Sequence, residues 1–95
     1  MRYRLSPRAQ ADLNEIWKYT ETHWSAAQAE RYIRAIQTAI EAVAADPRRG
    51  RACDDIRPGY MKVVTGSHVV FYRLVDGDID VVRVLHQRMN IDSHL

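Results

Sequence analysis

The chain has 95 residues, a length typical of one small domain, so we expect a single domain over residues 1–95. Apolar residues make up 46% and charged residues 27%, which is ordinary globular usage and argues against a disordered chain. The formal net charge of +2 is too small for a protein that binds nucleic acids in general. The single cysteine, Cys53, excludes a disulfide framework, and no apolar run suits a membrane span or a signal peptide, so we expect a cytoplasmic protein without a membrane partner.

The chain begins with a predicted short strand and a predicted amphipathic helix. Residues 3–5 read as a strand, after which Ser6 supplies an N-cap hydroxyl and Pro7 suits the first helical position. One side of the helix carries a mostly apolar stripe whose members recur every three or four residues: Ala9, Leu13, Ile16, Trp17, Thr20 and Trp24.

A second amphipathic helix follows directly. Ser25 and Gln28 have the spacing of a capping box, and Asp46 followed by Pro47 ends the helix because the residue before proline avoids the α region. Its apolar stripe is Ala29, Ile33, Ile36, Ile40 and Val43. Because the two helices are joined by a tight turn near Trp24, we expect a helical hairpin.

Beyond residue 60 the pattern changes to three runs rich in β-branched and aromatic residues, at 61–65, 68–75 and 78–85. Asp76 and Gly77 form a strong two-residue hairpin signal between the last two runs. The expected fold is therefore α+β, with the order β-α-α-β-β-β and the helical hairpin packed on a small antiparallel sheet.

The hairpin signal also predicts which side chains share a face of the sheet. With Asp76 and Gly77 in the loop, the numbers of cross-strand partners sum to 153 (76 + 77). One face then holds Leu74, Ile79, Tyr72, Val81, Val70 and Leu85 with Arg83 and His68, and the other holds Phe71, Val82, Val69 and Val84 with His86 and with Arg73 opposite Asp80. Since both faces are substantially apolar and only two long helices are predicted, we expect a partner chain or self-association to cover part of the second face.

The middle of the chain is basic. Residues 48–73 contain six basic and two acidic side chains, a local excess of +4. The four histidines and Cys53 lack metal-ligand spacing, and no phosphate-binding glycine motif is present, so we expect neither a metal nor a cofactor. Cys53 also has acidic neighbours, which raise the pKa of a thiol and disfavour a reactive thiolate.

Several basic and aromatic residues remain as candidates for chemistry or binding: Arg57, Tyr60, Lys62, Arg73, Arg83, His86 and Arg88. Such a set could cleave RNA without metal, with His86 as general acid or base and Arg83 and Arg73 around the phosphate. The competing interpretation is structural or partner-binding, because Arg73 has Asp80 as a cross-strand partner and Arg83 can extend past Val70. We favour the second interpretation.

The assembled motifs resemble ParE-type toxins of the RelE/ParE superfamily over nearly the entire chain. They are YRLSPRA at 3–9, Asp12-Leu13, Ile16-Trp17, AERY at 29–32, DPRRG at 46–50, RPG at 57–59, GSHVVFYR at 66–73 and VRVLH at 82–86 followed by Arg88. The resemblance implies the toxin of a type II toxin-antitoxin pair, neutralised by a cognate antitoxin that is ParD-like or another small DNA-binding protein.

The resemblance implies two possible targets. ParE-type members are associated with inhibition of DNA gyrase, whereas RelE-type members cleave messenger RNA on the ribosome. This chain lacks the closing tyrosine motif of several ribonuclease members and has only Lys18 and Lys62, which favours the gyrase branch; the alternative is a RelE-like, metal-independent endonuclease. We expect no sequence-specific DNA binding by this chain, and we expect target or antitoxin to contact Arg57, Lys62, Arg73, Arg83, His86, Arg88, Trp17 and Tyr32.

Overall fold

The computed structural model describes residues 2–89 and 91–95 and has the expected α+β architecture. Its elements are β1 (Tyr3–Leu5), α1 (Pro7–His23), α2 (Ala26–Ala45), a 3-10 turn η1 (Pro47–Arg49), β2 (Arg51–Ala52), β3 (Tyr60–Thr65), β4 (His68–Val75), β5 (Asp78–His86) and α3 (Ile91–His94). Both predicted helices and all the predicted strands are present. The short elements η1, β2 and α3 were not predicted.

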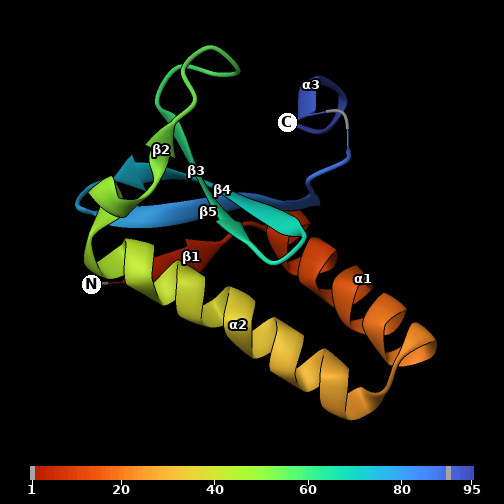
Figure 1. Cartoon of the computed structure of the whole chain (residues 1–95). Coiled ribbons are helices and arrows are strands. Elements are labelled where there is room, and N and C mark those ends of the chain that lie inside the picture. Colours follow the sequence, from red (N-terminus) through yellow and green to blue (C-terminus); the bar gives the residue numbers. More distant parts are fainter. Residues whose placement is uncertain (1, 90) are drawn as a thin grey trace.

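The helical hairpin forms as its caps indicate. The Ser6 side chain accepts a hydrogen bond from the Ala9 amide, and the Ser25 side chain accepts one from the Gln28 amide, each at 3.0 Å. These bonds satisfy backbone donors that have no partner inside a first helical turn. Helices α1 and α2 then run side by side along one face of the sheet (Figure 1).

The sheet has five strands in the order β1-β5-β4-β3-β2, and it is mixed rather than antiparallel. Strand β1 pairs with β5 in parallel, with Tyr3 beside Ile79, so the expectation of an antiparallel sheet was wrong for this edge. Parallel pairing requires a long crossover, and the helical hairpin lies within the long segment that connects these two strands.

An irregularity in β5 changes the predicted faces. Tyr72 pairs with Val81 as predicted, but Phe71 pairs with Arg83, so Val82 is an extra residue that forms a β-bulge. Beyond the bulge the partner numbers sum to 154, as for His68 and His86 (68 + 86). The predicted face assignments of Arg83, Val84, Leu85 and His86 relative to β4 were therefore wrong, because a one-residue insertion exchanges the two faces.

The face of the sheet toward α1 and α2 carries the main core. The largest fully buried side chains of this cluster are those of Tyr72, Ile36, Ile40 and Ile79. Burial of this apolar area, on the order of 25 cal/mol per Å², is the principal stabilising contribution to the packing of the hairpin on the sheet.

The opposite face is covered by the chain itself. Val69, Phe71 and Leu85 are buried together with Cys53, and Ile56, Tyr60, Ile91 and Leu95 pack over them. Figure 1 shows α3 and the loop before β3 on the side of the sheet away from α1 and α2. These residues therefore need no partner chain to bury them, so the reason for expecting one on this face was wrong: the loop after β2 and the C-terminal segment had not been recognised as covering elements.

Among the described residues, no helix has the length and apolar character that crossing a bilayer requires.

Candidate functional site

The predicted catalytic trio of His86, Arg83 and Arg73 is not brought together. Arg73 lies five residues from His68 along β4, roughly 17 Å at strand spacing, and His68 is the residue that pairs with His86. Arg73 is exposed and lies 3.9 Å from Asp80, as the cross-strand prediction requires. Arg73 and His86 therefore lie near opposite ends of β4.

Arg83 is an internal residue rather than part of the exposed surface. Only 8% of it is exposed, and its Nε and Nη2 donate to the two carboxylate oxygens of Asp12, both at 2.7 Å. Its third nitrogen, Nη1, donates to the His94 carbonyl at 2.7 Å. The hydrogen bonds and charge of Asp12 raise the pKa of Arg83 above its usual value, and burial opposes the shift. The three bonds together join α1, β5 and α3.

The other predicted cations lie at separate places. Arg57 donates to the Leu95 carbonyl on the face covered by α3, and Arg88 is exposed just after β5. Lys62 is half-buried on β3 and lines a hollow of about 430 Å³ with Arg49 and Arg51. Of the basic residues in the segment 48–73, those that lie close together in space are therefore at the β2–β3 edge.

That edge combines charge with unpaired strand. Strand β2 pairs only with Met61 and Lys62, so β3 continues past it from Val63 to Thr65. Val64 is 60% exposed at this point. A basic, partly apolar strand edge can accept an extended segment of another chain by main-chain hydrogen bonding.

Helix α1 carries a second hollow, of about 550 Å³. The half-buried Trp17 lines it together with Asn14 and Lys18. The predicted contact residue Trp17 thus has part of its ring available at the surface of the helical hairpin.

The structure assembles one cluster that the sequence did not predict. The Tyr32 hydroxyl lies 2.6 Å from His68 Nδ1 and accepts a hydrogen bond from the Ser67 amide at 2.9 Å. The His68 and His86 rings meet edge to face, with 5.2 Å between their centroids. Tyr32 and His86 were both predicted site residues, but His68 had been placed on the opposite face from His86, and only the bulge at Val82 brings the two rings together.

The environment of this cluster favours the neutral form of His68. Burial, and then the neighbouring His86, lower the pKa of His68 below its usual value, and Asp12 opposes the shift. His86 Nδ1 in turn accepts a hydrogen bond from the Arg88 amide at 3.1 Å.

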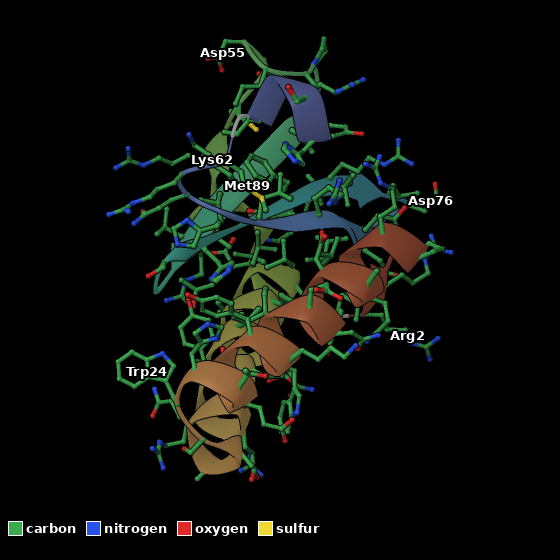
Figure 2. The ribbon with its side chains drawn as sticks, turned by 90° about the vertical axis from the view of Figure 1, so that its right-hand side faces the viewer. Arg2, Trp24, Asp55, Lys62, Asp76 and Met89 are labelled. Carbon is green, nitrogen blue, oxygen red and sulfur yellow. The ribbon has the colours of Figure 1, made fainter. Side chains whose placement is uncertain are left out.

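The cluster faces a hollow of about 250 Å³ between the hairpin and the ends of β4 and β5. Tyr19 and Trp24 form part of its lining and are 62% and 76% exposed. Figure 2 shows Trp24 at the end of the molecule opposite Asp55, projecting from the tip of the hairpin. Exposed aromatic rings beside half-buried hydrogen-bonding groups are typical of protein-interaction surfaces.

Cys53 is unsuited to nucleophilic chemistry. It is buried, and burial raises the pKa of its thiol above the usual value, with further contributions from Asp55 and Asp54 opposed by Lys62. The prediction that this thiol is not activated is confirmed.

Comparison with known proteins identifies the family. The family model described as the ParE toxin of the type II toxin-antitoxin system parDE matches residues 3–91. The chain belongs to the ParE toxin family. Membership implies a cognate antitoxin as partner, and the sequence-based prediction of a ParE-type toxin is confirmed.

Individual relatives match nearly the full length of the chain. The chain is 60% identical to Toxin ParE1 of Mycobacterium tuberculosis (strain H37Rv) over 95 residues, covering 99% of this chain and 97% of the relative. It is 48% identical to Toxin ParE1 of Caulobacter vibrioides over 93 residues, covering 98% and 96%. A solved chain of the chromosomal ParDE system from P. aeruginosa has the same fold, with a TM-score of 0.79 at 16% identity over 90% of this chain and 95% of that one.

Proposed function

We propose that this ParE-family toxin acts by binding DNA gyrase and inhibiting it, without cleaving RNA. The observation that favours binding over cleavage is the engagement of Arg83 by Asp12 and the His94 carbonyl, because an arginine held in this way is not available to a scissile phosphate. The separation between Arg73 and His68, the β4 residue that pairs with His86, also favours binding over cleavage.

The exposed cations are proposed to contact the target. Arg73 and Arg88 are both exposed and lie near opposite ends of the sheet. Charged residues at the rim of an interface steer association and fix the register of the partner, and reversing such a charge weakens complexes with acidic surfaces.

The experiment is a supercoiling assay with gyrase and relaxed plasmid, performed with the purified toxin. We expect inhibition by the wild type and at least about tenfold weaker inhibition by Arg88→Glu. The matched control is Arg8→Glu, which makes the same charge change at another exposed position, on α1. Equal inhibition by all three proteins would remove Arg88 from the interface, and no inhibition by the wild type would contradict gyrase as the target.

The RelE-like alternative is tested in parallel. Ribosomes translating a defined messenger RNA are incubated with the toxin, and cleavage is mapped by primer extension. Cleavage that is abolished by His86→Gln would overturn the proposal and assign a catalytic role to His86.

We also propose that the cognate antitoxin is ParD-like and binds through a flexible segment that orders on the hairpin surface and along the β3 edge. The hollow at Trp17 and the exposed Val64 beside Lys62 supply apolar area and an open strand edge for such a segment. The test uses the product of the adjacent open reading frame, and calorimetric titration should show weaker binding for Val64→Pro, which removes a main-chain donor from the edge.

A further inference from the structure

The hollow lined by Tyr19, Trp24, Tyr32, Ser67, His68 and His86 contains two imidazoles whose hydrogen-bonding roles can be assigned from their neighbours. An imidazole has two distinct nitrogens, and in the neutral ring one donates while the other accepts. The nitrogen that accepts therefore determines where the proton lies.

For His68 the decisive neighbour is Tyr32. The Ser67 amide donates to the Tyr32 oxygen, which leaves the Tyr32 proton to be donated to His68 Nδ1 at 2.6 Å. This arrangement uses each donor once and places the proton of the neutral ring on Nε2. The lowered pKa of His68 agrees with a ring that stays neutral.

For His86 the decisive neighbour is a backbone amide. The Arg88 N–H can only donate, so the His86 Nδ1 that it contacts at 3.1 Å must accept. The proton of the neutral His86 ring therefore lies on Nε2 as well. Within residues 2–89 and 91–95, neither Nε2 has a hydrogen-bonding partner.

The site thus offers two N–H donors, on lining histidines whose ring centroids lie 5.2 Å apart, beside exposed aromatic rings. A metal ion is a poor match, since it would require both Nε2 atoms to lose their protons, and no group of three potential metal ligands occurs in the described parts of the chain. A carboxylate is a good match because its two oxygens accept hydrogen bonds from two separate donors. The exposed Arg88 beside His86 and the net charge of +2 also favour an acidic ligand.

We propose that this hollow binds the side-chain carboxylate of an Asp or Glu in the antitoxin, through the Nε2–H groups of His68 and His86, while an adjoining apolar side chain of the antitoxin packs on Trp24. A protein partner is favoured over a free carboxylate because Trp24 and Tyr19 expose aromatic surface that a partner chain would bury. The proposal rests on the proposed binding of an antitoxin to the hairpin surface.

The test compares two substitutions of His86. His86→Gln keeps an N–H donor at about the place of Nε2, whereas His86→Leu removes it. We expect His86→Leu to lower the affinity for the cognate antitoxin by about tenfold or more, and His86→Gln to stay within about threefold of wild type. The matched control is Thr22→Leu, which replaces a polar side chain with leucine at an exposed position of the same hairpin end, outside the lining of the hollow.

The acidic residue of the antitoxin is found by replacing each Asp and Glu with Asn and Gln in turn. For the residue that binds in the hollow, the substitution should no longer lower the affinity when the toxin carries His86→Leu. This comparison is a double-mutant cycle across the interface. A direct probe is benzoate, whose titration should shift the ¹⁵N resonances of Nε2 in His68 and His86 of the wild type and not those of His23.

The outcomes separate this inference from the proposed function. If the antitoxin binds with equal affinity to wild type and His86→Leu, or if His86→Gln loses as much affinity as His86→Leu, the carboxylate site is wrong and antitoxin binding stands. If the wild type does not bind the antitoxin at all, the proposed partner is wrong, and the carboxylate site proposed for it is overturned as well.

Discussion

Arg83 and Asp12 form a bidentate ion pair across 71 positions of sequence, with both hydrogen bonds at 2.7 Å. Asp12 also accepts a bond from the Val84 amide at 3.0 Å, so one carboxylate joins α1 to two successive residues of β5. The side chains are 10% and 13% exposed. Either charge alone would be poorly solvated at this depth, so separating the two side chains is costly. The pair therefore holds α1 against β5.

Breaking this pair should destabilise the protein strongly. Asp12→Asn removes the charge that compensates Arg83, and we expect the free energy of unfolding to fall by about 3 kcal/mol. Urea denaturation followed by far-UV circular dichroism measures the change. The double variant Asp12→Leu with Arg83→Met should recover part of the loss, since no charge is then left buried. If the effects of Asp12→Leu and Arg83→Met, each measured alone, add up exactly to the effect of the double variant, a direct interaction is contradicted.

Gly50 lies against the ring of Tyr72. A Cβ at this position would overlap the Tyr72 hydroxyl and lie 2.9 Å from the Lys62 carbonyl oxygen. Tyr72 cannot move aside easily, because it is fully buried and donates to the Pro47 carbonyl at 2.7 Å. Gly50→Ala should therefore lower the free energy of unfolding by about 2 kcal/mol, measured by urea denaturation.

Two further variants isolate the cause. Gly59→Ala places a Cβ where nothing lies within 4 Å, at φ 83°, so only the backbone conformation is disfavoured, by about 1 kcal/mol. Tyr72→Phe removes the hydroxyl that Gly50→Ala would meet, so the two changes should be less than additive when combined. Additive effects would show that the Tyr72 hydroxyl is not what excludes a side chain at residue 50, and would assign the exclusion to the ring carbon at 2.8 Å and the Lys62 carbonyl oxygen at 2.9 Å.

The stability should depend on pH through His68. Burial and the neighbouring His86 lower the pKa of His68 below its usual 6.5, while Asp12 opposes this and Tyr32 bonds the ring. The folded protein then binds this proton less readily than the unfolded chain does. The stabilisation is fully present above the unfolded pKa and is lost as the pH falls toward the folded pKa.

Urea denaturation at about pH 7.5, 6.5 and 5.5 tests this dependence. The free energy of unfolding of the wild type should decrease over this range, and His68→Gln should decrease less. His23→Gln is the control, because His23 is exposed on the hairpin. If wild type and His68→Gln lose stability in parallel, His68 is not the group responsible.

The parts of the fold that were predictable depend on local chemistry. Ser6, Pro7 and Ser25 act within one helical turn, and the Asp76-Gly77 hairpin acts within four residues, so their patterns are visible in the sequence. The bulge at Val82 was not predictable in this way. Its carbonyl accepts a hydrogen bond from the Ser6 side chain at 2.7 Å, a contact between residues 76 positions apart.

The same limit applies to the candidate site. His86 and Tyr32 were selected by residue type and by family resemblance, and both lie in the hollow. Their connection through His68 depends on the shifted register after Val82, which exchanges the two faces of β5. Arg83 has a structural role, but the expectation that it extends past Val70 was wrong, because Val70 pairs with Val84. Its partner is Asp12 on α1, which no cross-strand pattern could indicate.

The C-terminal segment should act as a cover for the second apolar face. Ile91 and Leu95 pack over the cluster of Phe71 and Leu85, and the His94 carbonyl accepts from Arg83. Deletion of residues 91–95 should lower the free energy of unfolding by about 2 kcal/mol or more and increase the binding of a hydrophobic dye, because Phe71 and its neighbours become accessible. Urea denaturation and dye fluorescence measure the two effects, and Ser93→Ala, at an exposed position of α3, is the control. A truncated protein with unchanged stability and dye binding would show that the loop before β3 covers this face without the C-terminal segment. The expected result would show instead that residues 91–95 bury the apolar face for which the sequence pattern had suggested a partner chain.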